Sequence, residues 1–412
     1  MNPGMQHLHP YPFQKMEKLL GGLQPTSPSA AIDLSIGEPK HPTPRLVVEA
    51  LQQNLQGLAQ YPKIAGTDEL RAAISEWLQQ RFSLPQKPDP ASEIISVNGT
   101  REALFAIAQC LIDSGKGEQV LIPNPGYQIY EGAALLAGAV PTYLPLSRET
   151  DFVPQFDQVA ETVWRNTRLV YLCSPGNPCG GVASIDSLQQ LIKLAHRHEF
   201  VIASDECYSE IYRDEAAPPP GLLQAAAAMG ETSYRNCLVF HSLSKRSNAP
   251  GMRSGFVAGD ARLIQQFRQY RTYHGCAMPP PFQSASIAAW GDETHVQENR
   301  QQYRQKFDLA EQILTPYGIT APPASFYLWL PTPIDDQLFT QRLYSEQAVK
   351  VIPGSFLGRD GNQSASHGQF VSASASDRNN PGRHYVRCAL VAPVAECEQG
   401  LRRIAHLLEQ VA

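Results

Sequence analysis

The stretch RLVYLCSPGNPCGGVASIDSLQQLIKLAHRHEFVIASD, residues 168–205, decides the fold. It opens with a short apolar run over 168–173 and closes with a second over 200–204, and turn-forming residues bound both. Between the runs, apolar residues recur at the spacing of an amphipathic helix, namely Leu188, Leu191, Ile192 and Ala195. A strand, a helix and a second strand in this order predict a crossover between two parallel strands.

The same alternation extends from about residue 100 to residue 260. Further apolar runs of strand length occupy 118–123, 139–146, 237–242 and 255–259, and a helical pattern, EALFAIAQCLID, follows Gly99. The pattern predicts an α/β fold with a mostly parallel sheet that is buried on both faces. Functional residues in such sheets gather at the carboxyl ends of the strands.

After about residue 290 the pattern changes to a long polar helix, a strand-like SFYLWLP and a closing strand and helix, which indicates a smaller α/β domain. We expect an N-terminal arm and part of the small domain in 1–44, a large domain in 45–290 and the small domain in 291–412. Residues 360–382 are rich in Ser, Gly, Asn and Gln, which is typical of a mobile surface insertion.

Composition excludes several classes of protein. The chain has 412 residues, 42% of them hydrophobic, which is ordinary for a globular protein and excludes a largely disordered one. A net charge of −5 gives no basic face for nucleic acid or anionic lipid. The 8 cysteines show neither a CxxC pair nor the spacing of a metal site, so no metal is expected. Without a signal-peptide pattern or an apolar run of membrane length, we expect a cytoplasmic protein with no membrane partner.

The segment HSLSKRSNAPGMRSG, residues 241–255, carries the most chemical information. It follows a predicted strand, so Lys245 should emerge at the carboxyl end of that strand, close to Ser242, Ser244 and Arg253. Hydroxyls and an arginine can bind a phosphate, while a buried lysine beside a cation becomes the neutral amine that attacks a carbonyl. A solvated Ser/Lys/Arg loop would have the same composition.

This segment resembles the cofactor-lysine motif of the fold-type I, class I/II aminotransferases, and the likeness extends from about residue 30 to the C-terminus. The resemblance implies a large domain with a seven-stranded, mostly parallel sheet, and pyridoxal 5'-phosphate as cofactor. It implies that Lys245 links covalently to the cofactor and then moves the proton of the substrate. Ser242 and Arg253 would bind the phosphate, with Ser244 beside it.

Further motifs match the family in its order along the chain. In VNGTREAL (97–104) the backbone of Thr100 and Arg101 would contact the phosphate at the start of a helix, where an anion is favoured. In CSPGNPCGG (173–181) the resemblance assigns Asn177 to the ring oxygen of the cofactor and to the substrate carboxylate. Cys179 stands where the family usually has threonine. A plain helix start or an Asn-Pro turn would look the same in isolation.

Three further segments complete the implied cofactor site. In SDECYSEI (204–211) Asp205 would pair with the ring nitrogen, which makes the ring an electron sink, and Tyr208 would reach the ring oxygen. Tyr127 in PNPGYQIY would stack on the ring, with Tyr130 as the less favoured candidate. Tyr61 in YPKIAGTDELR matches the tyrosine that reaches the cofactor phosphate of the neighbouring subunit, which implies a homodimer with shared sites. In isolation these residues could equally be a helix cap, a core aromatic and a surface loop.

Two residues match the family's binding site for the substrate carboxylate. Arg387 lies in a predicted strand, where a charge is costly unless it has a partner, and an arginine can bind a carboxylate through two hydrogen bonds. Gly37 in LSIGEP matches the glycine whose backbone approaches the same carboxylate. His274 stands where the aspartate-specific branch has a second arginine, which argues against an enzyme dedicated to aspartate.

Within the family, the arm, YRTYHG, and the C-terminal VIPGSFLGRD and NPGRHYVRCALVAPVAEC resemble the succinyldiaminopimelate aminotransferases. The resemblance implies transfer of the amino group of glutamate to the keto acid of N-succinyl-diaminopimelate, with release of 2-oxoglutarate, in lysine biosynthesis. Two alternatives remain open. One is a related enzyme, such as a broad aromatic, alanine or aspartate transaminase or a carbon–sulfur β-lyase, and the other is a non-catalytic regulator with the same fold.

Overall fold

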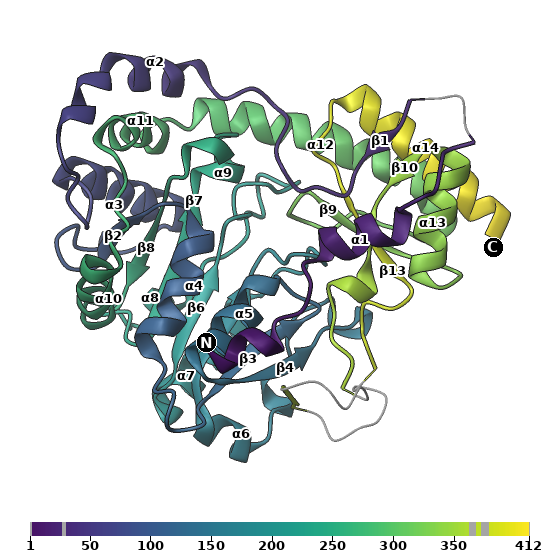
Figure 1. The fold of residues 1–412 in the computed structure, drawn as a ribbon. Coiled ribbons are helices and arrows are strands. Elements are labelled where there is room, and N and C mark those ends of the chain that lie inside the picture. Colours follow the sequence, from purple (N-terminus) through teal and green to yellow (C-terminus); the bar gives the residue numbers. More distant parts are fainter. Residues whose placement is uncertain (1, 27–29, 362–367, 372–378, 412) are drawn as a thin grey trace.

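The computed structural model describes residues 2–26, 30–361, 368–371 and 379–411. A large sheet lies at the centre of the bigger domain, and a smaller domain packs beside it (Figure 1). Among the described residues, no helix combines the length and the apolar character needed to cross a membrane.

The large sheet has eight strands in the order β12-β4-β3-β5-β6-β7-β8-β2. Their bounds are β2 Ile94–Val97, β3 Gln119–Asn124, β4 Val140–Pro145, β5 Thr167–Cys173, β6 Val201–Asp205, β7 Cys237–Ser242, β8 Gly255–Gly259 and β12 Gln369–Phe370. Only β8 runs antiparallel to its neighbours β7 and β2. The predicted mostly parallel sheet is therefore confirmed. Its strands β3 to β8 coincide with the six apolar runs of the sequence, whereas β2 was not predicted as a run, and the sheet has one strand more than the seven that the resemblance implied.

The eighth strand, β12, comes from the segment 360–382 that we expected to be a mobile surface insertion. Gln369 and Phe370 pair in parallel with Thr142 and Tyr143 of β4 and extend the sheet at its edge. The stretches 362–367 and 372–378 of that segment lie outside the described residues. The two-residue strand has no apolar run of its own, which is why its sequence gave no strand signal.

Helices cover both faces of the large sheet, so each strand is buried on two sides (Figure 1). The helices of this domain are α2 Arg45–Gln53, α3 Asp68–Phe82, α4 Thr100–Leu111, α5 Gln128–Ala137, α6 Glu161–Asn166, α7 Ile185–His198, α8 Leu222–Ala228, α9 Leu243–Arg246, α10 Ala261–His274 and α11 Pro280–Trp290. One core contains residues of α4, α5 and α10, and the other contains residues of α3, α7, α8 and α11. The loops at the carboxyl ends of β5, β6 and β7 lead directly into the predicted motifs.

The small domain has its own hydrophobic core. It contains a three-stranded sheet in the order β11-β13-β9 and a two-stranded sheet of β1 and β10. The bounds are β1 Ile32–Asp33, β9 Tyr327–Pro331, β10 Val349–Lys350, β11 Ile352–Pro353, β13 Tyr385–Ala389, α12 Thr294–Leu314, α13 Asp336–Gln347 and α14 Val394–Val411. Since β1 pairs with β10, the N-terminal segment belongs partly to this domain.

An N-terminal arm runs from one domain to the other (Figure 1). The first 3-10 helix packs on α5 of the large domain, whereas helix α1, Pro12–Leu20, packs on α13 and β11 of the small domain. The 3-10 helices are η1 Pro3–His7, η2 Leu55–Ala59, η3 Arg148–Thr150, η4 Phe156–Gln158, η5 Pro250–Met252, η6 Thr315–Tyr317 and η7 Gly354–Phe356. The arm thereby passes over the region between the two domains.

Candidate active site

A cavity of about 550 Å³ lies at the carboxyl ends of the parallel strands, between the two domains. All but one of the residues that the sequence assigned to a site line it. They are Gly37, Thr100, Arg101, Tyr127, Asn177, Asp205, Tyr208, Ser242, Ser244, Lys245, Arg253 and Arg387. Tyr11 of the arm and Tyr327 of β9 line it as well, and the sequence did not indicate either of them.

Lys245 lies in α9, the single helical turn that follows β7. Its amine donates a hydrogen bond of 2.6 Å to the backbone carbonyl of Gly37 and lies 5.2 Å from the centre of the Phe326 ring. Burial lowers the pKa of Lys245 from 10.5 to about 8, and the cations Arg387 and Arg253 act in the same direction. A substantial fraction of this amine is therefore neutral, and nucleophilic, near neutral pH.

Hydroxyls and a guanidinium beside Lys245 form a cradle suited to a phosphate. The Ser242 hydroxyl donates to Ser244 Oγ at 2.8 Å and accepts from the Ser244 backbone N–H at 3.0 Å, so the two side chains hold each other in place. Gly99 precedes α4 with a φ of +81°, and a Cβ there would collide with the Arg253 guanidinium. Glycine at 99 thus lets the start of α4 and Arg253 approach the same point, where a helix N-terminus favours an anion.

Asp205 ends strand β6 and is buried. Its carboxylate accepts 2.8 Å from the Tyr130 hydroxyl and 3.3 Å from the Cys207 backbone N–H. Burial raises the pKa of Asp205, and these hydrogen bonds oppose that rise. These two contacts include no cation that pairs with this carboxylate. A protonated ring nitrogen of a bound cofactor would supply that positive charge.

Arg387 lies in β13 and is buried, as its place in a predicted strand had suggested. One of its terminal nitrogens donates 2.9 Å to Asn177 Oδ1, and the other donates 2.9 Å to the backbone carbonyl of Ser35. Its Nε has no hydrogen-bond partner among the described residues, and no carboxylate of those residues pairs with it. A buried guanidinium without an anion is arranged to receive one.

Tyr327 of β9 connects the two domains at the cavity, and sequence reasoning missed it. Its hydroxyl lies 3.2 Å from the Tyr208 hydroxyl, and its ring lies 4.3 Å from the Arg387 guanidinium carbon. A Cβ at Gly37 would collide with the Tyr327 hydroxyl, so only glycine fits there. Within SFYLWLP this tyrosine reads as one more buried aromatic, and no local pattern singles it out.

Arg101 is the third arginine of the cavity wall, beside Arg253 and Arg387. We expected its backbone at the phosphate; its side chain donates 2.7 Å to the Tyr127 hydroxyl and 2.5 Å to the Tyr11 hydroxyl. None of the carboxylates that the structure describes forms an ion pair with it. The wall of the cavity therefore holds a positive charge that only neutral hydroxyls contact.

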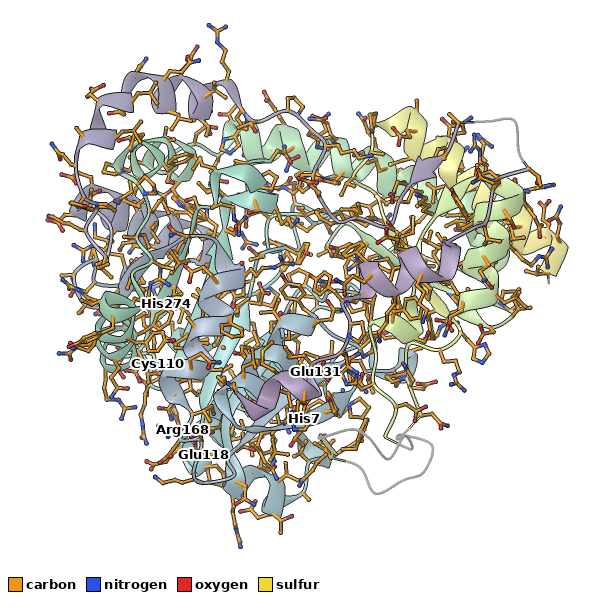
Figure 2. All side chains as sticks on the ribbon, viewed as in Figure 1. His7, Cys110, Glu118, Glu131, Arg168 and His274 are labelled. Carbon is orange, nitrogen blue, oxygen red and sulfur yellow. The ribbon has the colours of Figure 1, made fainter. Side chains whose placement is uncertain are left out.

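Two residues singled out from the sequence lie outside the cavity. Tyr61 does not line it within the described chain, and its side chain is fully exposed. His274 ends α10 on the surface (Figure 2), where its ring lies tilted against Tyr270 with the ring centres 5.7 Å apart. His274, Glu102 and Cys276 have ligand-type atoms within 4.8 Å of one another, but the Glu102 carboxylate already pairs with buried Arg271.

These residues fit the cofactor that the sequence implies. Lys245 supplies an amine for its aldehyde, and the Ser242–Ser244 pair with Arg253 supplies donors for its phosphate. Asp205 supplies a buried carboxylate for its ring nitrogen, with Tyr127 and Tyr208 in the same wall. The donor set thus matches an aromatic aldehyde that carries a phosphate and a basic ring nitrogen.

Known proteins resemble this chain along nearly its whole length. Residues 29–370 match the family model described as aminotransferase class I and II. An LL-diaminopimelate aminotransferase of Dehalococcoides mccartyi is 29% identical over 98% of both chains. One of Desulforudis audaxviator is 32% identical over 87% of this chain and 90% of its own.

Solved structures agree with the sequence comparison. The crystal structure of an aminotransferase from Neisseria meningitidis is 44% identical, with a TM-score of 0.91 over 99% of this chain and 100% of that one. An aminotransferase from Helicobacter pylori is 37% identical, with a TM-score of 0.87 over 98% of this chain and 99% of its own.

Proposed function

Because the chain belongs to the class I and II aminotransferase family and uses pyridoxal 5'-phosphate, we propose that it moves the amino group of glutamate to a diaminopimelate-type keto acid. The curated relatives described above are named for LL-diaminopimelate, which supports this class of substrate. The acceptor we propose is N-succinyl-2-amino-6-oxopimelate, whose product is N-succinyl-diaminopimelate.

The observation that carries this proposal is the presence in one cavity of two guanidinium groups, besides that of the phosphate-site Arg253, that have no carboxylate partner among the described residues. Arg387 can bind the carboxylate next to the reacting carbon through a bidentate pair. Arg101, held between the hydroxyls of Tyr11 and Tyr127, can then bind an anionic group at the other end of the substrate. Glutamate and the succinylated acceptor both carry such a second anion, whereas alanine and aromatic amino acids do not.

The remaining residues explain how the site would work. The bound cofactor supplies an aldehyde that takes up the amino group and a ring that takes up electrons. Lys245, with its pKa near 8, can hold or release a proton at Nζ near neutral pH and so move it between the substrate and the cofactor. The buried Asp205 carboxylate would keep the ring nitrogen protonated, and Ser242, Ser244 and Arg253 would anchor the phosphate.

We further propose a homodimer in which Tyr61 completes the phosphate site of the partner subunit. Tyr61 cannot serve its own cavity as described, because it is fully exposed and does not line it. Leu55 and Leu58 on η2 are also largely exposed and would be covered in the dimer. Sedimentation should give a dimer, and Tyr61→Phe should weaken cofactor binding without changing the dimer.

The test of the substrate compares N-succinyl-LL-diaminopimelate with LL-diaminopimelate as amino donors to 2-oxoglutarate, with glutamate formation as the readout. We expect kcat/KM to be at least about tenfold higher for the succinylated compound, and no activity in Lys245→Ala. A preference for free LL-diaminopimelate would contradict the succinylated acceptor. Aromatic donors and cysteine conjugates belong in the same panel, because their turnover, with pyruvate and ammonia from the conjugates, would identify the alternative enzymes.

A further inference from the structure

A buried lysine of the small domain has no role in the site described above. Lys306 of α12 is fully buried, and none of the acidic side chains in the described part of the chain forms an ion pair with it. A buried ammonium without a counter-charge is costly, and burial lowers the pKa of Lys306 to about 8. The groups that face it are His41, Lys40, Cys397 and Tyr303, whose ring centre lies 4.7 Å from the amine.

Lys306 is the first member of a chain of hydrogen bonds. Its Nζ lies 2.7 Å from Nε2 of His41, which must accept because the ammonium can only donate. The other ring nitrogen of His41, Nδ1, then carries the proton and donates to Asn299 Oδ1 at 2.8 Å. Burial and the Lys306 charge both lower the pKa of His41, which keeps the ring neutral, as this arrangement requires.

Asn299 connects this series of hydrogen bonds to the backbone of the active-site lysine. Its Oδ1 also accepts from Asn248 Nδ2 at 2.9 Å, which fixes the orientation of the amide. Its Nδ2 donates to the carbonyls of Lys245 at 3.3 Å and Arg246 at 3.4 Å. The bonds from Lys306 to His41, from His41 to Asn299 and from Asn299 to the Lys245 carbonyl therefore point the same way, and aligned bonds of this kind strengthen one another.

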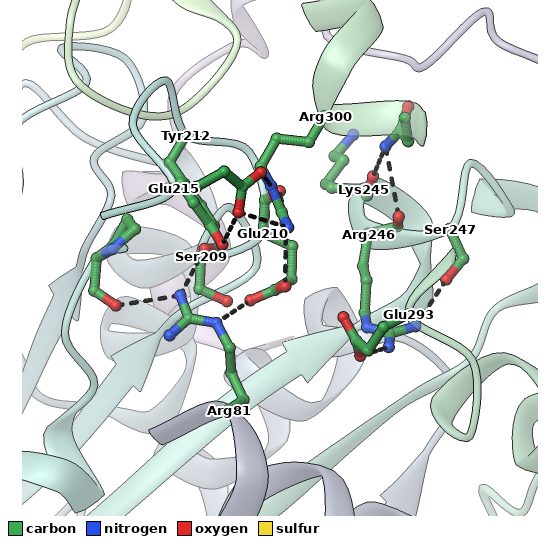
Figure 3. Close-up of polar contacts among 12 residues, drawn as sticks. Arg81, Ser209, Glu210, Tyr212, Glu215, Lys245, Arg246, Ser247, Glu293 and Arg300 are labelled. Carbon is green, nitrogen blue, oxygen red and sulfur yellow. Dashed lines mark hydrogen bonds and ion pairs between the residues drawn. The ribbon is translucent and has the colours of Figure 1, made fainter. Parts of the chain in front are cut away.

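The helix that receives these bonds needs outside support. Helix α9 has only the four residues Leu243–Arg246. The Leu243 carbonyl accepts from the Ser247 backbone N–H at 3.0 Å, whereas the carbonyls of Lys245 and Arg246 have their partner in the Asn299 amide. Segments at and around α12 hold it at two further points. Arg246 pairs with Glu293 (Figure 3), and the hydroxyl of Ser247, which follows α9, lies 2.8 Å from Nε2 of His295. Asn299 is thus the contact that acts on the backbone of Lys245 itself.

We propose that Lys306, His41 and Asn299 form a positioning relay that holds the Lys245 backbone so that its amine stays against the Gly37 carbonyl and the Phe326 ring. This inference deepens the proposed function, on which it rests for the role of Lys245. The relay residues are positioning residues, because they act through the α9 backbone. The groups facing the Lys245 amine are Cys207, Glu38, Arg253 and Arg387, none of which belongs to the relay.

The test measures how pH controls the capture of pyridoxal 5'-phosphate by Lys245 in the cofactor-free protein, followed by visible absorbance. The neutral amine adds to the aldehyde carbon and water leaves, so the rate should rise with pH to a midpoint near 8 in the native chain. In Lys306→Met and Asn299→Ala the loosened helix exposes the amine to water. We expect the midpoint to rise by about half a unit to one unit in each.

Two comparisons separate a relay from a general loss of stability. The double variant should shift the midpoint no further than either single variant, since both interrupt one path. His41→Gln keeps an acceptor and a donor and should retain the native midpoint, whereas His41→Leu should shift it. Lys193→Met removes an exposed lysine of α7 and should change nothing.

An unchanged midpoint in Asn299→Ala, or equal behaviour of the two His41 variants, would overturn the relay. If Lys306→Met does not fold, the comparison of His41→Gln with His41→Leu still tests the relay. No amino acid substrate enters this assay. A chain that captures the cofactor normally but does not use the succinylated substrate would contradict the proposed function alone.

Discussion

The hydroxyl of Tyr130 donates a hydrogen bond of 2.8 Å to the carboxylate of Asp205. Tyr130 is fully buried, and its ring stacks on Tyr171 with a centroid distance of 4.7 Å. Sequence reasoning considered it only as a second candidate for stacking on the cofactor. Its position indicates a different role. Its hydrogen bond stabilises the charged form of the Asp205 carboxylate, and the cofactor ring requires that charged form.

Tyr130→Phe should therefore weaken the enzyme without removing its cofactor site. The ring stays in place while Asp205 loses a donor that opposes the rise in its pKa, so that pKa should rise further. A lost hydrogen bond to a charged group corresponds to about 1.5–3 kcal/mol, and we expect kcat/KM at pH 7 to fall at least about tenfold. The acidic limb of the pH–rate profile should move to higher pH. An unmoved limb would contradict this role.

Arg101→Gln should change substrate preference more than overall activity. The variant keeps a polar side chain beside Tyr127 and Tyr11 but removes the charge that has no carboxylate partner. We expect kcat/KM for glutamate to fall about 10- to 100-fold and that for alanine to fall far less, since a charge-assisted pair contributes about 1.5–3 kcal/mol. Steady-state rates with both donors measure this. Equal losses of kcat/KM for glutamate and alanine would show that Arg101 does not bind the second anionic group of the substrate.

Gly99→Ala should weaken cofactor binding, because the added Cβ would collide with the Arg253 guanidinium. Gly230→Ala provides a matched control: both glycines have a φ of +81°, but a Cβ at 230 would meet nothing within 4 Å. Both variants should lower the free energy of unfolding by about 1 kcal/mol or more, and Gly99→Ala by more than Gly230→Ala, because the ψ of 155° at Gly99 lies in a region that is essentially restricted to glycine. Only Gly99→Ala should raise the Kd for pyridoxal 5'-phosphate, by about tenfold or more. Similar Kd values in both variants would argue against a phosphate site formed by the start of α4 and Arg253.

A buried ion pair joins the two domains beside the arm. Arg359 pairs with Glu131 of α5, which also accepts from the Tyr143 hydroxyl at 2.5 Å. Glu131→Gln should lower the free energy of unfolding by about 3 kcal/mol, because it leaves the buried guanidinium of Arg359 without a negatively charged partner. Glu398→Gln, which breaks an exposed pair with Arg402, should cost at most about 0.5 kcal/mol. Denaturant unfolding of both variants measures the difference.

The same pair predicts how stability depends on pH. Burial alone would raise the pKa of Glu131, but Arg359 and Tyr143 outweigh it and lower that pKa below 4.5. An acid whose pKa is lowered by folding contributes stability that is present above its unfolded pKa and is lost as pH falls through its folded pKa. The native chain should therefore lose more stability than Glu131→Gln as pH falls below about 4.5. Parallel stability curves for the two would contradict this.

The sequence predicted the parallel sheet and the residues around the cavity because both depend on local patterns. Asp205 comes at the end of an apolar run, and Asn177 and Lys245 lie a few residues beyond the ends of theirs; parallel strands bring such positions to one edge. Tyr327 and Tyr11 could not be predicted, since they reach the cavity only through packing of segments far apart in the chain. The edge strand at Gln369–Phe370 was missed for the same reason: its partner, not its composition, makes it a strand.

The arm has a practical consequence for work with this protein. The hydroxyl of Tyr11 contacts the wall of the cavity, and η1 rests on α5 only a few residues before it. An affinity tag fused to the amino end would extend from this arm, and any displacement of the arm would move Tyr11 at the cavity wall and alter measured rates. A tag that follows α14, whose end points away from the large domain in Figure 1, leaves the arm undisturbed.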